Sequence, residues 1–62
     1  MNWDDIPKKI KEARIKQGMS QKDLAKLVGV SNVFICQIES SKKKPRVENL
    51  LKISKILNIK FF

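Results

Sequence analysis

Gly29 is the residue that most limits how this chain can fold. The apolar residues before it recur at helical spacing, and Ser31, just beyond it, favours the first position of a new helix. Glycine most readily adopts the left-handed conformation that ends a helix. We therefore expect two short helices that meet at a sharp angle around Gly29.

The segment before Gly18 is predicted to form the first helix. Asp4 or Asp5 can begin it, because a carboxylate at a helix start accepts hydrogen bonds from free backbone amides. Pro7 fits because it falls in the first turn, where no amide donor is needed. The predicted apolar face of this helix is Ile6, Ile10 and Ala13.

Ser20 marks the start of the second helix. Its hydroxyl can cap the backbone while Asp23 reaches back to it, in an acidic form of the capping box. The predicted buried side of this helix is Leu24, Ala25, Leu27 and Val28.

Two more helices are predicted after Gly29. The third covers about residues 32–40, with Ile35 and Ile38 facing inward. A basic connection closed by Pro45 leads to a fourth helix that begins near Val47. The residues at helical spacing in this last segment are Leu50, Leu51, Ser54 and Leu57. No segment favours a strand, so the predicted fold class is all-α.

Composition limits the size of the core and the kind of partner. The 62 residues suffice for one domain, and Cys36 alone, without any His, excludes an internal disulfide and a Cys/His zinc site. Because Cys and His are so scarce, the sequence also offers no set of catalytic groups, so we predict no enzyme activity, cofactor or metal.

The charge of the chain indicates its kind of partner. Fourteen basic against six acidic residues give a net charge of +8, which indicates a polyanionic partner, with solvated basic surface as the alternative. No leader or membrane span is evident, so a cytoplasmic protein is expected.

The segment of about residues 21–40 resembles the helix-turn-helix unit of the phage repressor and Cro family. Small or apolar residues stand where that unit needs them, namely Leu24, Ala25, Val28, Gly29, Ile35 and Ile38. The likeness extends from Ile10 to Ile59, about four fifths of the chain. It implies a compact lambda repressor-like domain of four to five helices over residues 1–62, which binds double-stranded DNA.

Three residues are expected to contact bases. Asn32, Val33 and Gln37 occupy the base-contacting positions that the resemblance implies. Independently, Asn and Gln amides can donate and accept together at adenine N6 and N7, and Val33 can contact a thymine methyl group. Residues 33 and 37 also lie on one helix face. The alternatives are local hydrogen bonding for Asn32 and simple solvent exposure for Gln37.

Other residues are expected at the phosphates, with solvated surface as the alternative. Gln21 begins the second helix, where backbone amides attract an anion, and the resemblance implies that it also steadies Asn32. Ser31 can cap its helix and touch a phosphate, with the cap alone as the alternative explanation for this residue. The basic loop adds affinity without sequence information through Lys42, Lys43, Lys44 and Arg46. Trp3 and Phe34 are interpreted as packing residues rather than as base-stacking platforms.

The resemblance also implies a structural ion pair between Arg14 and Glu39, for which two independent exposed charges are the alternative. Several positions depart from the family pattern, among them Ser54 and Ile56, which replace small apolar residues, and two positions at helix ends. Ser41 stands where a Gly usually ends the recognition helix, which leaves the course of the next loop open. Arg46 replaces the usual Ser or Thr before the fourth helix, so that helix should lack a side-chain cap.

The carboxyl end is apolar, with almost no chain left to cover it. Its residues are Ile56, Ile59, Phe61 and Phe62. This end and the resemblance together predict a homodimer on a palindromic operator, with half-sites about 34 to 36 Å apart. Repression is the family's commoner outcome, and the expected location is the nucleoid of a prokaryotic or phage-infected cell. The alternative is a module that uses the same apolar end to bind a toxin or another protein.

Overall fold

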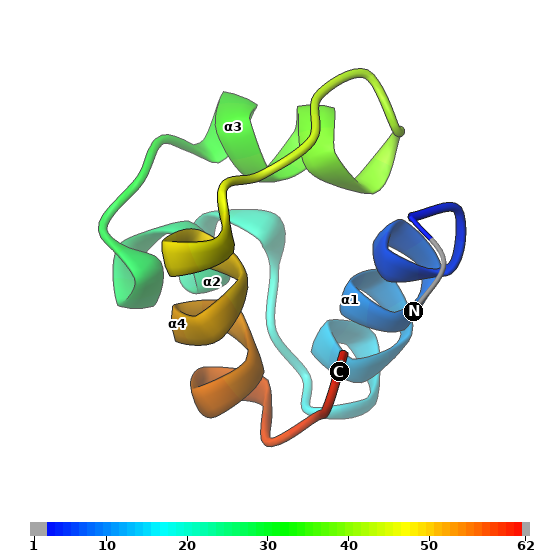
Figure 1. The fold of residues 1–62 in the computed structure, drawn as a ribbon. Helices are drawn as coiled ribbons and strands as arrows, with labels where there is room; N and C mark the ends of the chain where they lie inside the picture. Colours follow the sequence, from blue (N-terminus) through cyan, green and yellow to red (C-terminus); the bar gives the residue numbers. More distant parts are fainter. Residues whose placement is uncertain (1–2, 62) are drawn as a thin grey trace.

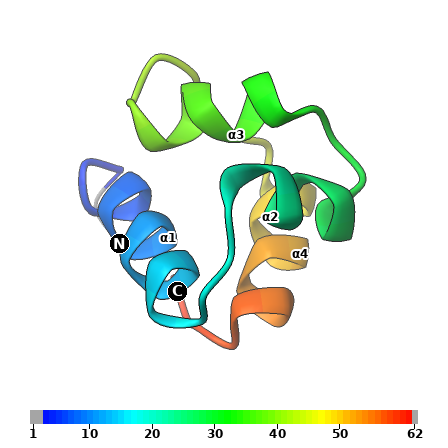
Figure 2. The same ribbon diagram turned by 180° about the vertical axis from the view of Figure 1, so that it is seen from behind.

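Four α-helices organise residues 3–61, the part of the chain that the computed structural model describes. They are α1 (Asp5–Lys16), α2 (Gln21–Val28), α3 (Asn32–Glu39) and α4 (Val47–Leu57). Helix α3 lies across one end of α1 and α4, and α2 packs against both α3 and α4 (Figures 1 and 2). None of these four helices is long and apolar enough to cross a bilayer.

Local capping explains where two of the helices begin. The Ser20 hydroxyl accepts a hydrogen bond from the Asp23 amide at 3.0 Å, and the Asp23 carboxylate accepts one from the Ser20 amide at 3.0 Å. This completes the predicted capping box of α2. The Ser31 hydroxyl likewise accepts from the Phe34 amide at 3.1 Å and caps α3.

The two other helix starts make no side-chain capping hydrogen bond. For Arg46 this confirms the prediction, because a guanidinium carries no acceptor. For α1 the predicted carboxylate cap is wrong. Asp4 precedes the helix but already has helical backbone angles, with φ −68° and ψ −24°, rather than the extended conformation typical of a capping residue.

All four helices in the described range end in the same way, with a residue in the left-handed conformation. These residues are Gly18, Gly29, Ser41 and Asn58, with φ of 73°, 86°, 65° and 55°. The next amide then turns back to an unpaired carbonyl of the last helical turn, as in the bond of 2.9 Å from the Lys42 amide to the Gln37 carbonyl. Ser41 therefore keeps the left-handed turn without glycine, which settles the course of the loop that the sequence leaves open.

The buried core draws on every helix and on the segment after α4. Its members are Ile6, Ile10, Leu24, Ala25, Val28, Ile35, Ile38, Leu50, Ile53, Leu57 and Phe61. The prediction that Leu27 is buried is wrong, since it is 58% exposed, and Leu51, which lies at helical spacing with Leu50 and Leu57, is 47% exposed. The buried face of α4 follows residues 50, 53 and 57, a 3.6-residue period that excludes Leu51 and includes Ile53, which the sequence reading misses.

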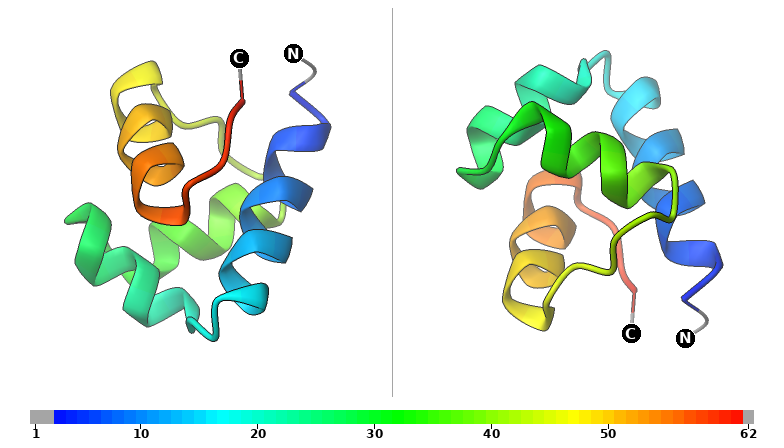
Figure 3. Two further views of the ribbon diagram at one scale, coloured as in Figure 1. Left: turned by 90° about the horizontal axis from the view of Figure 1, so that it is seen from below. Right: turned by 90° about the horizontal axis from the view of Figure 1, so that it is seen from above.

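The carboxyl end folds back onto the core. The left-handed turn at Asn58 reverses the chain after α4, and the final segment runs between α4 and α1 (Figure 3). Phe61 is only 4% exposed there, so the expectation that this apolar end lacks cover is wrong for Phe61. Ile56 and Ile59 are partly buried against the same core, and Phe62 lies outside the described residues.

Candidate nucleic-acid interface

Helix α3 has an apolar inner side and an exposed start. Ile35 and Ile38 are fully buried, at 0% and 1% exposure. Asn32 and Val33, the first two residues of the helix, are exposed, and Val33 is 63% accessible. The core therefore fixes one side of α3 while the side chains at its amino-terminal end remain free to contact a ligand.

Gln37 is half-buried and lies one helical turn beyond Val33. Three predicted base-contacting residues thus belong to one helix, with Asn32 and Val33 at its start and Gln37 near its end. Together these residues offer two amides, which can donate and accept hydrogen bonds, and the isopropyl group of Val33, which can make apolar contacts.

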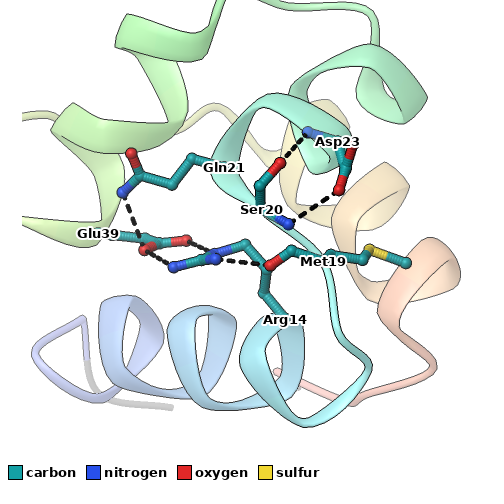
Figure 4. Close-up of polar contacts among 6 residues, drawn as sticks. All are labelled: Arg14, Met19, Ser20, Gln21, Asp23 and Glu39. Carbon is teal, nitrogen blue, oxygen red and sulfur yellow. Dashed lines mark hydrogen bonds and ion pairs between the residues drawn. The ribbon is translucent and has the colours of Figure 1, made fainter.

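An ion pair holds α3 against α1. The Arg14 guanidinium donates from Nε to Glu39 Oε2 at 2.7 Å and from Nη2 to Glu39 Oε1 at 3.0 Å (Figure 4). Both side chains are buried, at 10% and 4% exposure. Arg14 Nη1 also donates to the Met19 carbonyl at 2.7 Å, which ties the α1–α2 connection to the same group.

The pair is stabilised in its charged form. The hydrogen bond to Glu39 raises the pKa of Arg14 above its ordinary value, although burial opposes this effect. A paired guanidinium and carboxylate also contribute no net charge, so the +8 of the chain comes from other, mostly exposed groups.

Gln21 joins this cluster from α2. Its Nε2 donates to Glu39 Oε1 at 3.2 Å, so one carboxylate connects the starts or ends of three helices (Figure 4). The sequence does not predict this contact, and the role of Gln21 in steadying Asn32 stays a prediction. The contact arises because Gln21, half-buried at the first position of α2, shares the helix face of the buried Leu24 and Val28 and so is directed toward Glu39.

The loop from α3 to α4 carries exposed basic residues on either side of a buried proline. Lys42, Lys43, Lys44 and Arg46 are all exposed, whereas Pro45 between them is buried. Lys43 Nζ lies 5.0 Å from the centroid of the Phe34 ring, and Lys44 Nζ lies 5.6 Å from the centroid of the Trp3 ring. Neither contact is predicted from the sequence. For Trp3 the reason is that no sequence pattern links this residue to a loop about 40 residues further along the chain.

Ser31 contributes to this surface through its place at the start of α3. Its hydroxyl is committed to the cap, but the residue is exposed beside the free amides of the first helical turn. The interface therefore combines an exposed polar helix start with four exposed cations in the following loop. Such a combination suits a partner that has both hydrogen-bonding edges and regularly spaced negative charges.

Residues 10–62 match the family model described as helix-turn-helix. This match includes α2, α3 and α4 entirely and most of α1.

Three relatives named as regulators are similar to the chain. Repressor protein C2 of Salmonella phage P22 is 46% identical over 57 residues, which cover 92% of this chain and 26% of that protein. An uncharacterized HTH-type transcriptional regulator of Archaeoglobus fulgidus is 40% identical over 50 residues, or 81% of this chain and 71% of its own length. The HTH-type transcriptional regulator ImmR of Bacillus subtilis is 35% identical over 54 residues, or 87% and 42%. The chain thus spans about a quarter of the phage repressor.

Proposed function

The chain belongs to the helix-turn-helix family of the Cro and phage repressor type, a family of DNA-binding transcriptional regulators, and we propose that it reads double-stranded DNA with the start of α3 in the major groove. The observation that carries this proposal is the two-sided nature of α3. Its inner side is fixed by Ile35, Ile38 and the Glu39 ion pair, while Asn32 and Val33 stand exposed at its start.

The proposed division of labour follows from side-chain chemistry. Asn32 and Gln37 hydrogen-bond base edges, because an amide can donate and accept at adenine N6 and N7. Val33 meets a thymine methyl group by apolar contact. A rigidly held helix loses little freedom when these contacts form, which favours discrimination between bases.

Phosphate contacts are proposed for the groups around α3. Gln21 and Ser31 stand at helix starts, where free amides and the helix dipole attract an anion. The exposed cations of the following loop supply sequence-independent affinity. These cations are Lys42, Lys43, Lys44 and Arg46.

The proposal includes a dimer on a palindromic operator, joined at the C-terminal end, with half-sites about 34 to 36 Å apart. Phe61 is buried within its own chain, so the contact would use the partly exposed Ile59. The name of the phage relative supports repression as the outcome of binding. A regulator of this kind acts where the chromosome is, which in a prokaryote is the cytoplasm.

A toxin or other protein as the main partner has less support. That alternative depends on an uncovered apolar end, whereas Phe61 is buried, and the relatives reported above are named as a repressor and as transcriptional regulators. Salt-insensitive co-purification with one protein, together with an absence of DNA binding, would favour it over the DNA-binding proposal.

The proposal is tested by selecting duplexes from a random pool and then footprinting the selected site. If the four loop cations each neutralise one phosphate, log K should fall with log salt at a slope of about −3.6, and Lys43→Ala should reduce the slope by about 0.9. Lys55→Ala, at an exposed site on α4, is the control for net charge. A chain that protects no duplex even at low salt would overturn the proposal.

A further inference from the structure

Two loop lysines lie over aromatic rings. The ammonium of Lys43 is 5.0 Å from the Phe34 centroid, and that of Lys44 is 5.6 Å from the Trp3 centroid. Both distances are within the range of about 6 Å in which a cation is attracted to the face of a ring. The rings come from different parts of the chain, since Trp3 precedes α1 and Phe34 belongs to α3.

Both rings pack against other parts of the protein. Phe34 is half-buried and packs against the core, and Trp3 is 37% exposed. Trp3 also lines a small cavity of about 80 Å³ together with Ser41, Lys44 and the buried Pro45, so the amino-terminal segment packs on this loop. The lysines themselves are exposed and have long, flexible stems.

We propose that Trp3 and Phe34 are positioning residues, which hold the ammonium groups of Lys44 and Lys43 in place for contact with DNA phosphates. The inference rests on the DNA-binding function proposed above. It assigns a role in DNA affinity to the amino-terminal segment, through a side chain that does not itself touch DNA.

The physical reason is conformational entropy. An unrestrained lysine side chain loses much of its rotamer freedom when it binds a phosphate, and this loss of entropy opposes binding. A ring contact restricts the stem beforehand, so less freedom is lost on binding. The ammonium has three donors, and contact with a ring face on one side leaves donors on the other side for phosphate oxygens.

The test measures binding to a random-sequence duplex of about 20 base pairs, because phosphate contacts do not depend on sequence. Trp3→Leu removes the ring face, whereas Trp3→Phe retains it. We expect Trp3→Leu to weaken binding about threefold and to lower the salt slope, and Trp3→Phe to restore most of the affinity. Phe34→Leu should act in the same way through Lys43.

A double-mutant cycle separates positioning from a general effect on folding. In a Lys44→Met background, Trp3→Leu should have no further effect, whereas in the control background Lys55→Met it should keep its threefold effect. Melting temperatures monitor the fold of each variant. Equal affinity and slope for Trp3→Leu and wild type, or the same Trp3→Leu factor with and without Lys44, would overturn the inference while leaving DNA binding intact. A wild-type chain that binds no duplex would overturn the proposed function itself.

Discussion

Ser41 adopts a backbone conformation that glycine favours. Its φ of 65° places it in the left-handed region, which costs an ordinary L-residue roughly 1–2 kcal/mol. The turn persists because the amides of Ser41 and Lys42 satisfy carbonyls at the end of α3, at 3.1 and 2.9 Å. The hydrogen bonds of the helix end thus compensate for an unfavourable residue.

Ser41→Gly should therefore stabilise the domain. Glycine removes the left-handed penalty but adds about 0.5–1 kcal/mol of unfolded-state entropy, so we expect the free energy of unfolding to rise by about 0.5–1 kcal/mol. Urea denaturation measures the change. Ser40→Gly is the matched control and should lower stability, because Ser40 has an ordinary φ of −92°. A lower urea midpoint for Ser41→Gly would contradict this account of the turn.

Arg46 precedes α4 without capping it and is also proposed to contact a phosphate. Its backbone is already extended, with φ −71° and ψ 158°, but its side chain makes no capping bond. Arg46→Ser should raise the free energy of unfolding by about 1 kcal/mol and lower the salt slope of DNA binding by about 0.9. Arg46→Ala should show the second effect without the first. Equal stability of the Ser and Ala variants would argue against the missing cap.

At the scale of elements, Glu39 joins three helices through Arg14 and Gln21. Glu39→Ala would leave the buried Arg14 charge without its partner, so a loss of about 3 kcal/mol is expected, a large share of the stability of a small domain. Glu39→Gln keeps the shape and one acceptor and should cost less. Chemical denaturation compares the two variants, and an unchanged midpoint for Glu39→Ala would show that the ion pair does not stabilise the fold.

The capping box of α2 predicts a dependence on pH. The hydrogen bond from the Ser20 amide, followed by that with the Ser20 hydroxyl, lowers the pKa of Asp23 below its ordinary value of 3.8. A carboxyl group whose pKa is lower in the folded state stabilises the fold above its ordinary pKa, and this contribution is lost as the pH falls through the folded value. Asp23→Asn should therefore lose less stability than wild type when melting temperatures are followed from pH 6 down to pH 2. Parallel curves would contradict the role of the carboxylate.

Helix boundaries could be predicted where capping is local, and burial could not be predicted in full. Ser20, Gly29 and Ser31 define their helix ends through bonds to near neighbours, so the sequence is sufficient there. Leu27 and Leu51 are apolar at nearly helical spacing, yet only the placement of the neighbouring helices determines which apolar residues are covered. The left-handed turn at Asn58 is missed because no glycine marks it in the sequence. Without this turn the chain would not fold back, so the burial of Phe61 is missed as well.

At the scale of the whole molecule, the candidate site combines local and distant features. The exposure of Asn32 and Val33 could be predicted, because it follows from the inward direction of Ile35 and Ile38 on the same helix. The contact between Lys44 and Trp3 could not, since it depends on how the amino-terminal segment packs on a distant loop. The shared core includes residues of all four helices and Phe61 of the folded-back carboxyl end, which runs between α4 and α1 (Figure 3).

The central claim is that the exposed start of α3 reads base edges. The most direct test measures the affinity of wild type and Asn32→Ala for a selected operator and for each of its single-base substitutions. We predict that wild type discriminates by about 1–3 kcal/mol at the base pair that Asn32 contacts, and that Asn32→Ala loses discrimination at that position while keeping it elsewhere. If Asn32→Ala keeps the full wild-type preference at every position, α3 does not read DNA through its start.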